Sequence, residues 1–153
     1  MQKANIPGIG QATLDASSWV QQDKEGAELY YSPKNVLDKK FGTSWQVSNN
    51  GGIGETITIR WSASHSFSIS LVNGFAKTED LYNQNNRITG IRLTCLSMNS
   101  STENLVLADN KMDYQSAGSC TNANGISLEV TDVAKGSKWQ DAAISEIKFD
   151  LMH

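Results

Sequence analysis

The sequence predicts an all-β protein, an antiparallel β-sandwich, and three observations support this fold class. Short segments in which apolar and polar residues alternate recur between residues 57 and 151. Such alternation places one face of a strand in the core and the other in water. No run of ten or more residues follows the helical period, and loops rich in Gly, Asn and Ser separate the segments. Short alternating strands joined by such loops are typical of a sandwich.

The elements are expected in the following order. Residues 1–29 are polar and contain several glycines, which predicts an irregular N-terminal segment packed on the domain, and residues 30–153 are expected to form the sandwich. A helical turn is expected at residues 33–37, with Ser32 as N-cap and Pro33 in the first helical position. Strands are then expected on Ile57, Ile59 and Trp61; Phe67, Ile69 and Leu71; Ile91, Leu93 and Cys95; Leu105 and Leu107; Ile126, Leu128 and Val130; and Ile147, Phe149 and Leu151.

Length, net charge and the absence of long apolar runs exclude several classes of protein. A chain of 153 residues is expected to form one domain with a single core. A net charge of −3 argues against a nucleic-acid partner, because binding phosphates needs clustered Lys and Arg. No apolar run is long enough for a transmembrane segment, and the first residues lack the apolar stretch of a signal peptide. We nevertheless expect an extracellular or cell-surface protein, with its leader outside this sequence.

The two cysteines, Cys95 and Cys120, lie on separate predicted segments. They lack the C-x-x-C spacing of a structural zinc site. Two buried thiols and one disulfide both fit the sequence, and an extracellular location favours the disulfide.

The segment from Asn73 to Arg87 is the strongest candidate for a functional loop. It lies between two predicted strands and is much longer than the usual connection of about four to six residues. Three apolar residues, Phe75, Leu81 and Tyr82, indicate that it is ordered. An ordered structural loop, with one helical turn at residues 77–82, is the alternative.

Carbohydrate recognition needs planar hydrogen-bonding side chains for hydroxyl groups and an aromatic face for the C–H patches of a sugar ring. The Asn73–Arg87 segment is rich in the first kind, and tryptophans in polar loops supply the second. The predicted ligand-binding residues are Trp45, Asn73, Lys77, Tyr82, Asn85, Asn86, Arg87, Trp139 and Asp141.

A hard cation such as calcium needs several oxygen ligands. Asp38 and Thr43 in one loop, together with Glu146 near the C-terminus, can supply part of such a set. The alternative is that Asp38 caps its own loop and Glu146 is solvated or paired with a lysine. The neighbouring Lys39 and Lys40 argue against a tight site.

Catalytic motifs are absent from the sequence. There are two histidines, no Gly-x-Ser-x-Gly elbow and no His-Glu-x-x-His pair. The glycine-rich run at residues 51–54 leads into a strand rather than a helix, so it lacks the helix N-terminus that binds phosphate. We therefore expect a protein that is not an enzyme.

Several motifs, taken together in their order along the chain, resemble those of a known family. They are Asn35-Val-Leu-Asp38, Thr43-Ser-Trp45, Gly52-Ile-Gly-Glu-Thr-Ile, Asn73-Gly-Phe-Ala-Lys with Tyr82 and Asn-Asn-Arg87, and Asp132-Val, Gly136, Asp141 and Ile144-Ser-Glu-Ile-Lys-Phe149. The sequence resembles the NADase-type glycan-binding domain of the discoidin-like branch over about residues 30–150. It is similar to the non-catalytic N-terminal domain of secreted bacterial NAD glycohydrolases.

The resemblance implies a jelly-roll sandwich of the galactose-binding-like type that works attached to, or beside, another protein. It implies no NAD hydrolysis, because it concerns the binding domain. Many discoidin-like domains hold a structural calcium, and Asp38, Thr43 and Glu146 match those positions, although Lys40 replaces a residue that is often acidic.

Two functions from different classes follow. The first is a non-catalytic, secreted carbohydrate-binding module with a glycan as ligand. The second is an adhesion module that binds a protein partner or a membrane surface, with Phe41 and Trp139 as the apolar loop residues.

Overall fold

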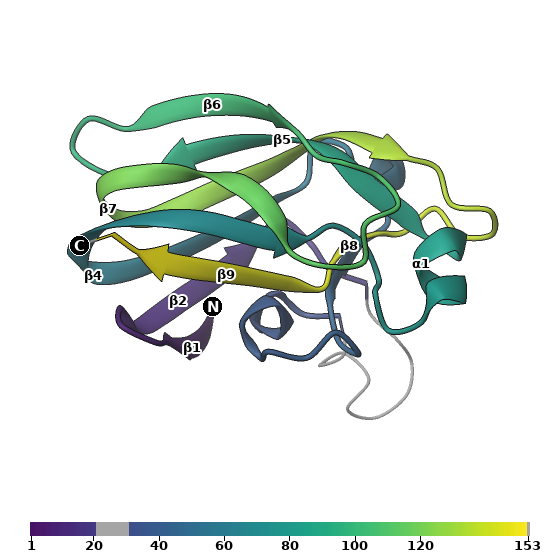
Figure 1. Cartoon of the computed structure of the whole chain (residues 1–153), viewed down its shortest axis with the longest axis horizontal. Coiled ribbons are helices and arrows are strands. Elements are labelled where there is room, and N and C mark those ends of the chain that lie inside the picture. The colour runs from purple at the N-terminus through teal and green to yellow at the C-terminus, as the bar shows by residue number, and fades with distance from the viewer. Residues whose placement is uncertain (21–30, 153) are drawn as a thin grey trace.

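The computed structural model describes residues 1–20 and 31–152, and strands make up most of it (Figure 1). In these described residues three short helical elements interrupt the strands: two 3-10 helices, η2 and η3, and the α-helix α1. The elements in chain order are β1 (Gln2–Ile6), β2 (Gly10–Ala16), η2 (Pro33–Leu37), β3 (Trp45–Val47), η3 (Asn49–Gly52), β4 (Thr56–Val72), α1 (Glu79–Gln84), β5 (Asn86–Cys95), β6 (Ser101–Val106), β7 (Gln115–Ala134), β8 (Ala142–Ile144) and β9 (Glu146–Leu151).

The nine strands form one curled sheet in the order β1-β2-β4-β7-β5-β8-β3, with β6 paired to β5 and β9 paired to β4. All pairs are antiparallel except β5 with β8, which align in parallel over two residue pairs. The predicted all-β jelly-roll sandwich is therefore confirmed.

Strands β4 and β7 connect the two layers of the sandwich. The first part of β4, residues 57–60, pairs with β2, and its last part, residues 67–72, pairs with β9. Strand β7 pairs with β4 over both parts, with irregular register between Arg60 and Phe67. Two strands of 17 and 20 residues thus curl from one layer into the other.

The structure differs from the predicted elements in three places. The segment expected to be irregular, residues 1–29, contains the hairpin β1–β2, whose Leu14 is fully buried. Residues 57–61 and 67–71, expected as two strands, are one strand with bulges. The expected strand at residues 126–130 extends back to Gln115. The predicted domain boundary at residues 29 and 30 lies outside the described residues.

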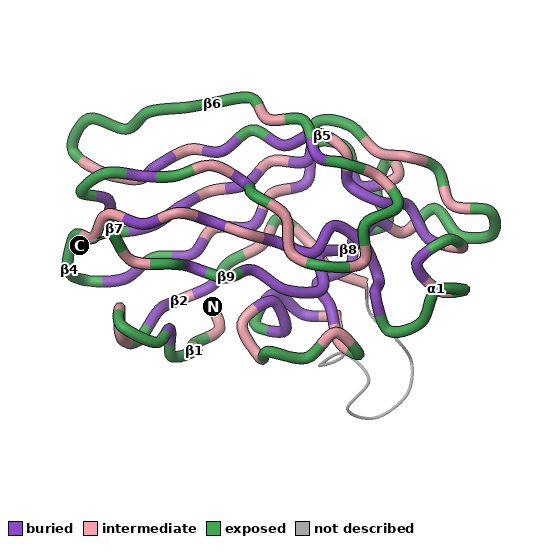
Figure 2. The backbone as a smooth tube through the Cα atoms, in the orientation of Figure 1, coloured by how far each residue is buried: buried purple, intermediate pink, exposed green. Residues whose placement is uncertain are grey.

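The core lies between the layers and follows the predicted alternation (Figure 2). Trp61, Phe67 and Phe149 contact one another edge to face, with ring centroids 5.3–5.4 Å apart. A second, smaller cluster of Val72, Ala76 and Tyr82 lies beneath the loops, and Phe41, Met112 and Tyr114 pack against it. The loops at this end therefore have an apolar anchor of their own.

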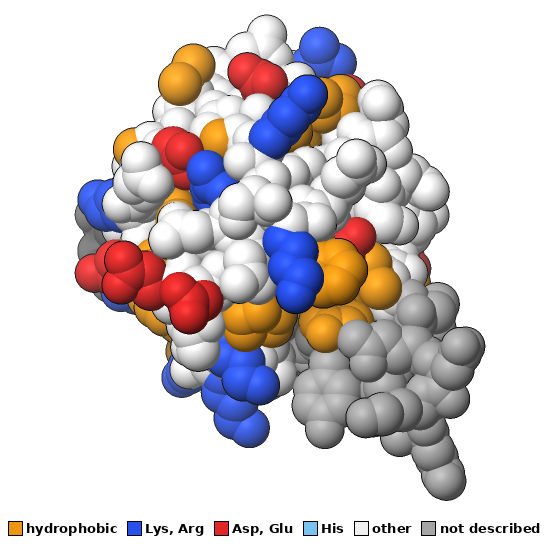
Figure 3. Space-filling model, turned by 90° about the vertical axis from the view of Figure 1, so that its right-hand side faces the viewer, with side chains coloured by type: hydrophobic (Ala, Val, Ile, Leu, Met, Phe, Trp, Pro, Cys, Tyr) orange, Lys and Arg blue, Asp and Glu red, His pale blue; other side chains and the backbone are white. Residues whose placement is uncertain are grey.

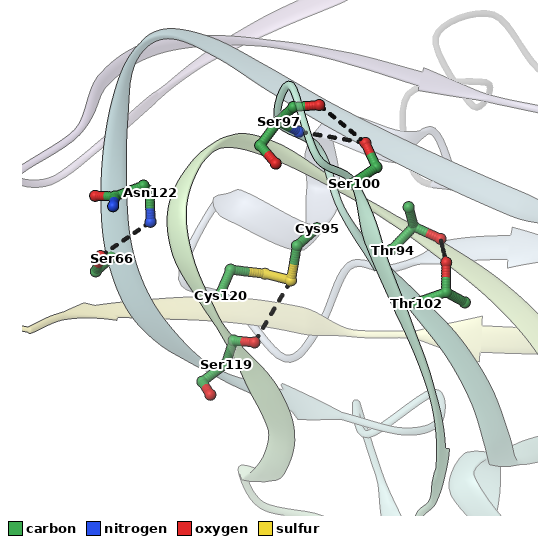
Figure 4. Close-up of a disulfide and its surroundings, with 9 residues drawn as sticks. All are labelled: Ser66, Thr94, Cys95, Ser97, Ser100, Thr102, Ser119, Cys120 and Asn122. Carbon is green, nitrogen blue, oxygen red and sulfur yellow. Dashed lines mark hydrogen bonds between the residues drawn. A yellow bond between two sulfur atoms is a disulfide. The ribbon is translucent and has the colours of Figure 1, made fainter.

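Cys95 and Cys120 form a disulfide between the end of β5 and the first half of β7 (Figure 4). Both residues are buried. Of the two states that fit the sequence, the structure shows the disulfide. None of the helices in residues 1–20 and 31–152 is long and apolar enough to cross a membrane.

Removing the disulfide is expected to lower the free energy of unfolding without changing the fold. The bond closes a loop of 25 residues, and the loss of that constraint on the unfolded chain costs about 3 kcal/mol. Urea unfolding of the Cys95→Ala/Cys120→Ala variant measures this change. A variant as stable as the parent would show that the disulfide does not stabilise the domain.

Candidate functional site

The loops that carry most of the predicted ligand-binding residues meet at the end of the sandwich where α1 lies (Figures 1 and 3). Hydrogen bonds join the segment after β4, the loop between β6 and β7, the loop between β7 and β8, and η3. Figure 3 shows Lys and Arg side chains next to hydrophobic ones on this end, with acidic side chains to one side. This end is called the loop end below.

Asn73 holds the start of the Asn73–Arg87 segment. Its side-chain amide donates to the carbonyls of Ile88 and Ala108, both at 2.8 Å, and its side-chain oxygen accepts from the Tyr82 hydroxyl at 3.0 Å. Tyr82 is almost fully buried, and burial raises the pKa of its hydroxyl. Both side chains therefore hold the segment in place rather than face solvent.

Ser145, between β8 and β9, fixes the next part of the segment. Its hydroxyl donates to the Gly74 carbonyl at 2.5 Å and accepts from the Ala76 amide at 2.9 Å. A Cβ on Gly74 would lie 2.6 Å from the Tyr82 ring, so a glycine is needed at this close approach.

Arg87, at the start of β5, is the centre of the largest hydrogen-bond network at the loop end. Its guanidinium pairs bidentately with Asp109, with Nε–Oδ1 at 2.9 Å and Nη2–Oδ2 at 3.1 Å. Nη1 donates to three main-chain carbonyls, those of Asn83, Asn85 and Lys135. The hydrogen bond from Arg87 holds the pKa of the Asp109 carboxyl below its usual range.

Asn85 and Asn86 are also used internally. The Asn85 amide donates to the Leu81 carbonyl at 2.8 Å, which ends α1. The Asn86 amide donates to the carbonyls of Gly51 and Gln140, both at 3.1 Å, and its oxygen accepts from the Gly136 amide at 2.8 Å. A Cβ on Gly136 would lie 2.2 Å from the Gln84 carbonyl oxygen, so the loop needs a glycine there.

The nine predicted ligand-binding residues therefore divide into two groups. Six are buried: Trp45, Asn73, Tyr82, Asn85, Asn86 and Arg87. Trp45 lies in the core, and its indole N–H donates to the Ser18 carbonyl at 2.9 Å. The expectation that these six contact a sugar directly is not supported by their burial, and they position the loops instead. Lys77, Trp139 and Asp141 remain at least partly exposed.

Trp139 is the most exposed of the tryptophans in the described residues, at 49%. Its loop is held firmly, because the amides of Lys138 and Trp139 both donate to the Gln84 carbonyl and that of Ser137 donates to Asn83. The Lys138 ammonium lies 5.0 Å from the centre of the indole ring. Asp141, further along the loop, is half-buried, and burial raises the pKa of its carboxyl.

A pocket of about 360 Å³ lies between η3 and the loop that carries Trp139. This volume falls in the range of small-ligand pockets, about 300–1,000 Å³. Asn50, Lys135 and Gln140 give it amide and ammonium groups, and Ile53 and Val133 give it apolar surface. The pocket therefore combines the two kinds of group that a sugar needs.

The three predicted metal ligands lie close together, although Glu146 follows Asp38 and Thr43 by more than 100 residues in the sequence. The Thr43 hydroxyl donates to Asp38 Oδ2, the Lys40 amide donates to Asp38 Oδ1 at 2.9 Å, and the Lys39 amide donates to Glu146 Oε1 at 3.0 Å. Both lysine side chains are exposed, and the Lys39 ammonium lies close enough to the Glu146 carboxyl to act on it electrostatically. No cluster of three or more His, Cys, Asp or Glu side chains occurs in the described part of the chain.

The environment of Glu146 fits a cation. The residue is 2% exposed, and burial together with the nearby Asp38 carboxylate raises the pKa of its carboxyl to about 9. Two carboxyl groups this close hold a proton when no cation neutralises them. The donors are carboxylate and hydroxyl oxygens, which are the ligands that hard cations prefer.

Sequence reasoning missed Asp109, Ser145 and the pocket residues Asn50 and Gln140. Asp109 lies in an ordinary polar loop with no motif around it. The available signal was Arg87 itself, because a buried guanidinium needs a carboxylate partner.

Comparison with known proteins shows the family of the chain. A sequence model of the family described as the NAD glycohydrolase translocation F5/8 type C domain matches residues 7–150. The chain belongs to this family. No curated protein sequence matches the chain significantly.

Solved structures of similar fold are F5/8 type C domains and family 32 carbohydrate-binding modules. An F5/8 type C domain from Bacteroides fragilis aligns with a TM-score of 0.66 and 10% identity over 93% of each chain. The family 32 module of AlyQ, in complex with 4,5-unsaturated mannuronic acid, gives 0.65 and 14% over 100% of this chain and 99% of that one. The module of NanJ from Clostridium perfringens, in complex with galactose, gives 0.62 and 16% over 92% and 93%.

These identities establish the fold alone. In a longer AlyQ chain the matching region covers 34% of the protein, which also contains an alginate lyase domain. Domains of this fold thus occur as parts of multidomain enzymes.

Replacing Arg87 is expected to destabilise the domain. Arg87→Ala removes the charged partner of Asp109 and one hydrogen-bond donor from each of three carbonyls, at a cost of about 3 kcal/mol. Arg92→Ala is the matched control, because its ion pair with Glu129 is exposed at 3.4 Å and worth about 0.5 kcal/mol. Urea unfolding of both variants compares them, and equal losses would contradict a structural role for Arg87.

Proposed function

We propose that this domain is a non-catalytic carbohydrate-binding module of a secreted or cell-surface bacterial protein. The observation that carries the proposal is Trp139, a half-exposed aromatic side chain on a firmly held loop of the loop end. Structural neighbours that hold a sugar, the modules of AlyQ and NanJ, share the fold. In this reading the sugar contacts Trp139, and the pocket groups Asn50 and Gln140 bind its hydroxyls.

The same comparisons support the proposed partners. A module of this kind serves a parent multidomain protein or acts beside another protein, and its ligand is a glycan. The buried disulfide supports an extracytoplasmic location, because disulfides persist in oxidising compartments.

Adhesion to a membrane or a protein through apolar loop tips is the second candidate function. It has less support, because Phe41 packs edge to face on Tyr114, with centroids 5.5 Å apart, rather than projecting from its loop. Trp139 is then the single loop tryptophan available for it among the described residues.

We also propose that Asp38, Thr43 and Glu146 hold a calcium ion. The ion would replace the proton on the Glu146 carboxyl and join the loop after η2 to the start of β9. Its contribution would be structural, because Glu146 is buried and accepts from the Lys39 amide, while the Thr43 hydroxyl of the same loop donates to Asp38.

Trp139→Ala is expected to weaken glycan binding by about tenfold or more while leaving the fold intact, because the side chain is half in solvent. A glycan array identifies a ligand, and titration of that ligand gives the affinities. Met98→Ala is the control, since Met98 is fully exposed on the loop between β5 and β6. Unchanged affinity for Trp139→Ala would place the sugar elsewhere, and no binding on the array would favour a protein partner.

The calcium proposal predicts a link between pH, metal and stability. In metal-free protein the Glu146 carboxyl has a folded pKa of about 9 and an unfolded pKa near 4.5. Its stabilising contribution is therefore complete below pH 4.5 and is lost as the pH rises through 9. Glu146→Gln is expected to remove this slope, and calcium at 100 times its Kd should add about 2.7 kcal/mol to the parent alone.

Thermal unfolding with calcium and with chelator, from pH 5 to 9, measures both effects. Glu129→Gln is the matched control, because Glu129 is at the surface beside Arg92. An equal calcium response in Glu146→Gln would rule out this site.

A further inference from the structure

A groove of about 440 Å³ lies between the C-terminal strand β9 and the N-terminal hairpin. In Figure 1, β9 lies directly above the hairpin and η2. Five consecutive β9 residues, 146–150, form one wall. Ile6, Pro7 and Leu37 give the groove an apolar lining, and Tyr114 adds an aromatic side chain.

Strand β9 is an edge strand within the described structure, because it pairs with β4 on one side and with no strand on the other. The Met152 amide donates to the Ser66 carbonyl at 2.9 Å, which sets the direction of the main-chain groups. The main-chain amides and carbonyls of successive residues point to opposite sides of a strand, so those of Lys148 and Asp150 point toward β4. The main-chain amides and carbonyls of Ile147 and Phe149 point toward the open edge of the sheet.

Two amides and two carbonyls of Ile147 and Phe149 therefore border the groove. None of them forms a hydrogen bond with another group in residues 1–20 or 31–152. Unpaired edge groups next to an apolar channel are a template for an added strand.

We propose that this groove binds an extended peptide segment of a partner protein, which adds to β9 as a further strand. The groove follows five residues of β9, about 13 Å of strand, so it accommodates four or five peptide residues. Peptide residues opposite Ile147 and Phe149 form the main-chain hydrogen bonds, and their side chains face the apolar lining.

The positive charge of Lys148 favours an acidic residue at the peptide position between the two that lie opposite Ile147 and Phe149. The peptide residue opposite Lys148 faces the solvent side of the sheet, with its Cβ about 5 Å from that of Lys148. The Lys148 ammonium lies 3.7 Å from Asp150 and 5.7 Å from the Tyr114 ring centre, and is 55% exposed. Lys39 also lines the groove and forms no ion pair with a described residue. The two acidic residues of the lining are Asp150, which pairs with Lys148, and Glu146, which is buried. An acidic residue flanked by two apolar ones therefore fits best.

The test uses the ¹⁵N-labelled domain and three synthetic peptides. The first is acetyl-Thr-Val-Glu-Val-Thr-amide, the second carries Lys in place of Glu, and the third is N-methylated at both valines. The first peptide is expected to shift the amide signals of Ile147 and Phe149. Reversing the charge or blocking the valine amides should weaken binding by about tenfold each.

Two variants locate the effect. Lys148→Glu should reverse the preference between the Glu and Lys peptides. Asn5→Trp fills the groove from its exposed rim and should abolish binding, whereas Asn104→Trp, exposed on β6, should not. Absence of β9 shifts with every peptide up to about 1 mM overturns the proposal. It is equally overturned if the N-methylated peptide binds as well as the first, or if a glycan but no peptide shifts these amides.

Discussion

The guanidinium of Arg87 connects three segments that are far apart in the sequence: the C-terminal part of α1, the loop between β6 and β7, and the loop that carries Trp139. Its side chain is 11% exposed, so Asp109 and the three carbonyls replace the water that the charge would otherwise bind. Because Nη1 bonds the Lys135 carbonyl, the position of Trp139 depends on a residue that no ligand needs to contact. The loop end thus has a buried polar support beneath a small exposed surface.

Part of this architecture could be predicted from the sequence, and part could not. The alternation at Ile57, Phe67 and Ile126 determines which face is buried, and it predicted the layers correctly. It did not show that β4 continues through residues 62–66, because bulges break the alternation without breaking the strand. The hairpin β1–β2 was missed since its strands are short and adjoin glycines at positions 8 and 10.

The functional residues were harder to predict for a different physical reason. An amide such as that of Asn73 or Asn86 bonds a main-chain carbonyl and a sugar hydroxyl with the same geometry, so composition alone does not separate the two partners. The burial of the side chain shows whether it bonds the main chain or is available to a ligand, and burial depends on the whole fold. The proximity of Asp38, Thr43 and Glu146 was easier to predict, because they belong to motifs whose order along the chain identifies them, and metal binding by these residues stays a prediction.

Strands β4 and β7, which pass from one layer to the other, determine how the domain unfolds. Residues 57–60 and 67–72 of β4 belong to opposite layers and share one continuous backbone, as do the two halves of β7. Neither layer can therefore peel away while the other persists. We therefore expect the described part of the domain to open in a single cooperative event.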